Sequence, residues 1–116
     1  MDIYREIVLE HYKHPLHKGK VSRADFSADA VNPSCGDILH VEFQIAKDGT
    51  IEDAKFSGTG CAISQAAADL VIDKLEGRSN KEVSKITKED VFDLLGGPVN
   101  PGRERCALLI VQALNK

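Results

Sequence analysis

Alternating apolar and polar residues predict a β-hairpin in the middle of the chain. Residues 39 to 45 alternate in this way, which is the period of a half-buried strand. Asp48-Gly49 is a typical hairpin turn, and a second strand-like run follows from 51 to 56. A shorter alternation from 26 to 30 predicts one more strand. We therefore expect a small antiparallel sheet of about three strands.

Apolar residues that recur at spacings of three and four predict helices. The first helix is expected from residue 2, whose carboxylate can cap it, to about residue 13. The second is expected from 62 to 75, and a short capped one from 87 to 95. A last helix should extend from near Arg103 to the C-terminus. Packed on one face of the sheet, these helices make an α+β fold.

Size and charge limit the classes of protein to consider. A chain of 116 residues with 42% hydrophobic content predicts one domain, residues 1 to 116, because two cores would each bury too little surface. The formal charge of -3 argues against nucleic acid or an anionic membrane as the main partner. The chain begins with acidic residues and lacks a long apolar stretch. A cytoplasmic protein that does not enter the membrane is expected.

The cysteines are the main candidates for chemistry. Their number, three, rules out complete internal pairing, and a reducing cytosol opposes disulfides. Cys35 lies in a turn, whereas Cys61 and Cys106 lie at predicted helix starts, where the helix dipole favours a thiolate. Asp37 follows Cys35 by two residues and projects to the same side of an extended segment. The alternatives are small buried cysteines and an ordinary turn aspartate.

Three thiolates and one carboxylate suit either of two metal groups. They satisfy the four coordination positions of Zn(II) or of a two-iron cluster. A hard oxygen donor holds the iron of such a cluster less firmly than a thiolate does. We therefore hypothesise that Asp37 keeps a cluster transferable.

Four segments carry a resemblance to a known family. They are YREIVLEHYKHPLHKG at 4–19, NPSCGD at 32–37, IEDAKFSGTGCAIS at 51–64 and RCALL at 105–109. In this order, over nearly the whole chain, they resemble the IscU/SufU/NifU N-terminal family of iron-sulfur scaffold proteins. The resemblance implies a SufE/NifU-like α+β fold and a [2Fe-2S] cluster, or Zn(II) in the same site, held by Cys35, Asp37, Cys61 and Cys106.

The resemblance also implies partners. Sulfur would come as a persulfide from a PLP-dependent cysteine desulfurase, and the cluster would pass to acceptor apoproteins. Such a protein is an assembly scaffold and not an enzyme. The Hsp70 recognition signal of IscU-type members is not intact at Gly97-Pro98-Val99-Asn100, so that chaperone is not expected. Both a monomer and a homo-oligomer remain open.

Two features point to different branches of the family. Arg105 stands where IscU-type members have histidine, as in SufU-type members, but the interval from Cys61 to Cys106 lacks the SufU-type insertion. A scaffold would hold iron and sulfide, with Cys106 as first sulfur acceptor. A SufU-like zinc-dependent sulfurtransferase would relay persulfide sulfur, with Cys61 as acceptor. The sequence leaves both open.

The histidines, and two other classes of protein, are also considered as explanations of function. His40 is expected to be solvated; His11, His14 and His17 lie in a basic segment that is either a solvated arm or a docking surface for an acidic desulfurase patch. A Cys/His hydrolase would use Cys61 as nucleophile, but no signature surrounds it. A purely structural zinc domain is disfavoured because the predicted elements can form a core without metal.

Overall fold

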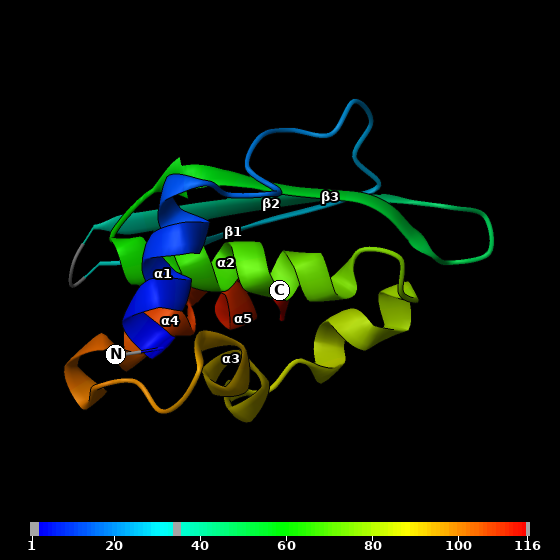
Figure 1. Ribbon diagram of the computed structural model, residues 1–116. Coiled ribbons are helices and arrows are strands. Elements are labelled where there is room, and N and C mark those ends of the chain that lie inside the picture. Colours follow the sequence, from blue (N-terminus) through cyan, green and yellow to red (C-terminus); the bar gives the residue numbers. More distant parts are fainter. Residues whose placement is uncertain (1–2, 34–35, 116) are drawn as a thin grey trace.

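Three antiparallel strands form the sheet in a computed structural model that describes residues 3–33 and 36–115 (Figure 1). The strands, in spatial order, are β1 (Phe26–Asn32), β2 (Asp37–Ile45) and β3 (Ile51–Thr59). The predicted turn joins β2 to β3, with Gly49 at a φ of 92° and the Thr50 N–H donating to Asp48 Oδ1 at 2.9 Å. The expected sheet is thus confirmed, with strands two or three residues longer than the sequence indicated at β1 and β3.

The helices gather on one face of this sheet, as Figure 1 shows. They are α1 (Ile3–Lys13), α2 (Ala62–Leu75), α3 (Lys88–Leu95), α4 (Glu104–Ala107) and α5 (Leu109–Leu114), with short 3₁₀-helices η1 (Asn80–Lys85) and η2 (Pro101–Arg103). The predicted cap of α3 is present as a reciprocal capping box between Thr87 and Asp90. The expected cap at Asp2 lies outside the described residues. The α+β architecture is confirmed.

The hydrophobic core lies between the sheet and α2. Alternate residues of β2 and β3 face it, and Leu39, Val41, Phe43 and Phe56 are almost completely buried. The small residues Ala66, Ala67 and Ala68 of α2 are buried too, which lets this helix pack close to the strands. The helix carrying Cys61 is therefore held at the centre of the fold.

The prediction of one continuous C-terminal helix is wrong. The chain forms η2, then α4, and then α5, because Leu108 adopts a φ of -94° and a ψ of 5° instead of helical angles. Helical periodicity does not reveal this single-residue change, since both short helices bury apolar residues on the same side. Cys106 consequently lies on a helix of four residues.

The basic segment after α1 is not a solvated arm throughout. Asp69 of α2, which is completely buried, accepts the backbone N–H groups of Leu16 and His17 at 2.9 and 2.8 Å, and its second oxygen pairs with His11 Nδ1 at 2.7 Å. His17 is 6% exposed and bonds Asp73 through Nε2 at 2.9 Å. The expectation of a solvated arm fails for His11 and His17, because their carboxylate partners on α2 lie many residues away in the sequence, whereas His14 is exposed.

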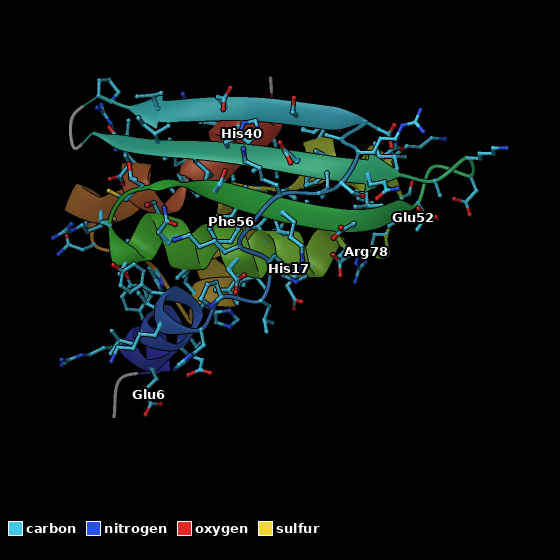
Figure 2. All side chains as sticks on the ribbon, turned by 90° about the horizontal axis from the view of Figure 1, so that it is seen from above. Glu6, His17, His40, Glu52, Phe56 and Arg78 are labelled. Carbon is cyan, nitrogen blue, oxygen red and sulfur yellow. The ribbon has the colours of Figure 1, made fainter. Side chains whose placement is uncertain are left out.

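His40 has two carboxylate partners that the sequence did not predict. It lies on the face of β2 that is turned away from the helices (Figure 2), between Asp29 at 2.6 Å and Glu42 at 2.9 Å. The hydrogen bond with Glu42, followed by that with Asp29, raises the pKa of His40 above 6.5. His40 is therefore partly exposed on the outer face, as expected, and is also paired with two carboxylates.

Among the helices that the structure describes, none combines the length and the apolar character needed to span a membrane.

Candidate metal centre

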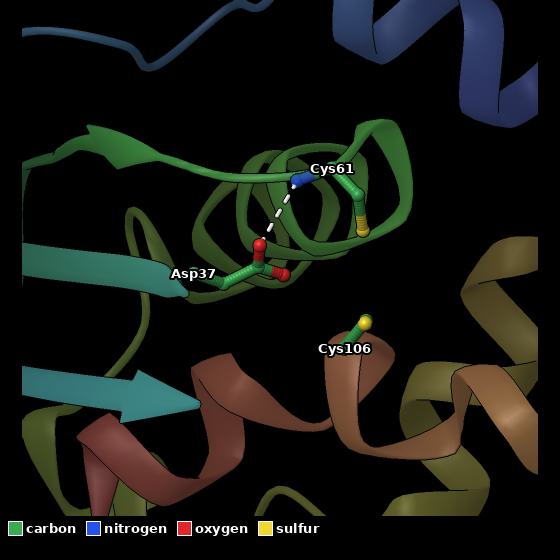
Figure 3. A group of neighbouring side chains, drawn as sticks. All are labelled: Asp37, Cys61 and Cys106. Atoms are coloured by element: carbon green, nitrogen blue, oxygen red, sulfur yellow. Dashed lines mark hydrogen bonds between the residues drawn. The ribbon is translucent and has the colours of Figure 1, made fainter. Parts of the chain in front are cut away.

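Asp37, Cys61 and Cys106 meet at one end of the sheet. One carboxylate oxygen of Asp37 and the sulfurs of Cys61 and Cys106 all lie within 4.8 Å of one another. Figure 3 shows the three side chains converging from the start of β2, the start of α2 and the short helix α4. Three residues far apart in sequence thus present one hard and two soft donors to a common point, as a metal site requires.

Asp37 is the unusual member of this group. It is 3% exposed, and a buried carboxylate normally has its oxygens satisfied. Among the described residues, its Oδ1 accepts one hydrogen bond, a long one of 3.3 Å from the Cys61 N–H. Its Oδ2 has no partner among the described residues. An orphaned buried oxygen beside two sulfurs fits a metal ligand better than the turn aspartate considered from the sequence.

Cys61 occupies the N-cap position of α2, as its place in the sequence predicted. Its backbone is extended, with a φ of -73° and a ψ of 166°, and its side chain makes no capping bond. The thiol is half-buried and lies 3.9 Å from the hydroxyl oxygen of Ser64, which itself donates to the Cys61 carbonyl at 3.0 Å. The sulfur thus lies near Ser64 of its own helix and also points toward the common point of the three side chains (Figure 3).

Cys106 enters the site from the opposite side. It is 5% exposed, but its sulfur lies within the 4.8 Å group and not remote from it. An ion pair at 2.8 Å between Lys88, at the start of α3, and Glu104 holds α4. Arg105, in contrast, is exposed to solvent. Its guanidinium stays protonated and cannot act as a ligand.

Two glycines allow the close packing of the backbone around the site. A Cβ at Gly58 would approach the Ile38 carbonyl oxygen to 2.1 Å, and its φ is 134°. A Cβ at Gly60 would lie 2.7 Å from Ser64 Oγ and 2.9 Å from the Asp37 carboxyl carbon. A side chain at either position would displace Asp37 or the strand that carries it. The Gly-rich sequence before Cys61 is thus required by close packing.

The remaining predicted ligand, Cys35, lies outside the described residues. Ser64 is a further member of the site that the sequence argument did not include. A hydroxyl three residues after an N-terminal cysteine of a helix lies on the same helix face, so the spacing Cys61 to Ser64 was the available signal. None of the four histidines belongs to the donor group.

The whole described chain matches a known protein family. The model of the NifU-like N-terminal domain matches residues 3–116. The chain therefore belongs to the NifU-like N-terminal family, which confirms the resemblance noted in the sequence.

Relatives from both branches are similar to the chain. The iron-sulfur cluster assembly scaffold protein IscU 1 of Archaeoglobus fulgidus is 32% identical over 114 residues, which cover 98% of this chain and 73% of the relative. The zinc-dependent sulfurtransferase SufU of Bacillus subtilis is 33% identical, with 98% of this chain and 88% of the relative covered. Sequence identity is nearly the same to both relatives, so it does not assign the chain to the IscU-type or the SufU-type branch.

Solved structures share the fold. The crystal structure of the SUF-system protein FiSufU from Fervidobacterium islandicum AW-1 has a TM-score of 0.79 and 27% identity, covering 97% of this chain and 93% of that one. The N-terminal part of a NifU-like protein from Brucella abortus has a TM-score of 0.73 at 20% identity, which supports the fold alone.

Proposed function

We propose that this protein is a scaffold on which [2Fe-2S] clusters are assembled in the cytoplasm and from which they pass to acceptor apoproteins. The observation that carries the proposal is the convergence of the Asp37 carboxylate with the sulfurs of Cys61 and Cys106 within 4.8 Å. Cys35, near Asp37 in sequence, is proposed as the fourth ligand. The cluster is the cargo of the site and not a permanent cofactor.

The donor set supports a site that both holds and releases a cluster. Thiolates bind the iron of a cluster firmly, whereas a carboxylate is a harder and weaker donor for it. Asp37 is buried and its Oδ2 has no partner among the described residues, so a bound iron would gain this oxygen without breaking an existing hydrogen bond. An acceptor thiol would displace the oxygen before it displaces a sulfur.

Sulfur would be delivered by a PLP-dependent cysteine desulfurase as a persulfide. In the scaffold, Cys106 is the proposed first acceptor, and Cys61 shares the site with it. The exposed basic side chains of the segment after α1, such as Lys18 and Lys20, are proposed to meet an acidic patch of the desulfurase. Such an interface would weaken at high ionic strength.

A zinc-dependent sulfur relay is the second candidate. Arg105 directly before Cys106 favours it, as does the similarity to the Bacillus SufU. The same residues would hold Zn(II), with Cys61 as sulfur acceptor after release from the metal. However, the alignment with that SufU extends over 131 positions, against 114 with the archaeal scaffold protein. It therefore contains gaps where this chain lacks SufU residues, and we rank the scaffold first.

Anaerobic reconstitution decides between the two candidates. The full-length chain is incubated with ferrous iron, cysteine and a cysteine desulfurase, and metal in the protein as purified is analysed in parallel. A scaffold should develop visible charge-transfer absorption with about two irons per site and then activate an apo-ferredoxin. Tightly held zinc, with faster desulfurase turnover and no visible absorption, would overturn the scaffold in favour of the relay.

Matched variants test the residues. Cys61→Ser and Cys106→Ser should lose the cluster absorption, whereas Asp93→Ala, which removes an exposed charge of α3, should keep it. Retained absorption in both cysteine variants would remove these residues from the site, whatever the function of the protein.

A further inference from the structure

The two sulfurs of the centre lie close enough for a reaction that needs no metal. Those of Cys61 and Cys106 are at most 4.8 Å apart, whereas a disulfide requires about 2.05 Å between sulfurs. We propose that the pair is a site of oxidative modification, at which a hydroperoxide forms an intramolecular Cys61–Cys106 disulfide in the metal-free protein. The proposal does not depend on which metal or cluster the centre holds.

The backbone around both cysteines can supply the remaining approach. Cys61 is an N-cap residue with extended backbone and no capping bond. Cys106 lies on a four-residue helix between η2 and the break at Leu108. In the proposed reaction both side chains rotate and α4 shifts until the sulfurs bond, while α2 stays wound. A disulfide within the interior of a long helix would lack this freedom.

The exposure of the two thiols sets the order of the steps. Cys61 is half-buried, whereas Cys106 is only 5% exposed, so a dissolved peroxide reaches Cys61 first. The Cys61 thiolate forms a bond to one peroxide oxygen, the O–O bond breaks, and the leaving oxygen takes a proton from water. Cys61 is then a sulfenic acid, oxidised by two electrons.

Cys106 completes the reaction. Its thiolate attacks the sulfur of the Cys61 sulfenic acid, the S–S bond forms, and the S–O bond breaks with release of water after protonation by solvent. In total two thiols and one hydroperoxide give one disulfide, one water and one alcohol or second water. Both sulfurs are then unable to bind a metal as thiolates. Oxidation and metal binding should therefore exclude each other.

Peptide mapping of the whole, metal-stripped protein tests this proposal. Trypsin separates the cysteines onto peptides 24–47, 56–74 and 106–116, so each pairing has its own mass. After a stoichiometric amount of hydrogen peroxide under non-reducing conditions, we expect peptides 56–74 and 106–116 to be linked. Thiols titrated in the unfolded protein should fall from three to one per chain. A link that includes peptide 24–47, a dimer joined between chains, or loss of thiols without a link would overturn the proposal.

Variants separate the two steps. Cys35→Ser should still form the link, whereas Cys106→Ser should accumulate a Cys61 sulfenic acid that reacts with dimedone. Cys61→Ser should show little labelling of Cys106 at the same dose; equal labelling would refute the assigned order. Saturating zinc should slow formation of the link in the wild-type chain, and an unchanged rate would show that metal and disulfide do not share these sulfurs. None of these results depends on cluster transfer. They therefore test the disulfide independently of the proposed scaffold function.

Discussion

Two buried aspartates, Asp37 and Asp69, have different surroundings and different roles in this fold. Asp69 is 0% exposed, and both its oxygens are used: two backbone N–H groups bond one oxygen and His11 bonds the other. Asp37 is 3% exposed, yet one oxygen has a single long bond and the other none among the described residues. Satisfied polar groups stabilise a fold, whereas an unsatisfied one costs free energy unless a ligand completes it.

The positions of the two aspartates also indicate which parts of the fold can carry a metal site. Asp69 lies within α2 and fixes the segment after α1 to that helix. Asp37 lies at the first position of β2, beside the first turn of α2 and the short helix α4. The ends of helices and strands leave space and polar atoms available for a metal. In the interior of a helix or strand, the side chains are already used in packing.

The largest expected effect is the loss of folding stability when Asp69 is replaced. Asp69→Ala should lower the free energy of unfolding by about 3 kcal/mol or more, because each buried donor left unpaired costs about 1–3 kcal/mol. Asp37→Ala is the matched variant, and it should change the unfolding free energy of the metal-free protein by less than about 1 kcal/mol. Urea unfolding of both measures this difference. Equal losses would show that the two carboxylates are not distinct in role.

A methyl group at Gly60 should affect the site and the fold together. Gly60→Ala places a Cβ against Ser64 and Asp37, and such overpacking costs about 1–3 kcal/mol. It should also weaken zinc binding, measured by competition with a chromophoric chelator. Gly102→Ala is the control, because a Cβ there meets only Asn100 Oδ1 at 3.5 Å. Similar behaviour of the two variants would contradict the close packing around Asp37.

Cluster release should depend on Asp37 in a scaffold. Asp37→Ala should slow transfer to an apo-ferredoxin by about tenfold, or about 1.4 kcal/mol in the barrier, because exchange must then begin at a thiolate. Transfer is followed by the change in visible circular dichroism when the cluster changes protein. Asp93→Ala controls for the loss of charge. An unchanged rate would remove Asp37 from this role while leaving it as a ligand.

The smallest effect concerns His40, whose carboxylate partners lie on the surface. Because Glu42 and Asp29 raise its pKa above 6.5 in the folded protein, its contribution to stability is complete below 6.5 and is lost as the pH rises through the folded value. The stability difference between wild type and His40→Gln should therefore shrink from pH 5.5 to pH 8.5. NMR titration of His40 gives its pKa directly. A value at or below 6.5 would contradict the ion pairs.

Local patterns determined much of this protein. The alternation in β2 and β3, the hairpin turn, the capping box of α3 and the position of Cys61 at the start of α2 were all predicted, because each depends on residues a few positions apart. The family segments contain Cys35, Asp37, Cys61 and Cys106, which the resemblance implies as ligands of one site. Their role as ligands stays a prediction.

Tertiary structure decided the rest. Only folding brings the start of β2, the start of α2 and α4 to one point, joins His11 to Asp69, and divides the C-terminal helix at Leu108. Distances between segments depend on how the whole core packs, and no local period encodes them. Local sequence thus determined the elements and the chemistry of the donors. Long-range packing determined which donors meet and which oxygen of Asp37 has no partner among the described residues.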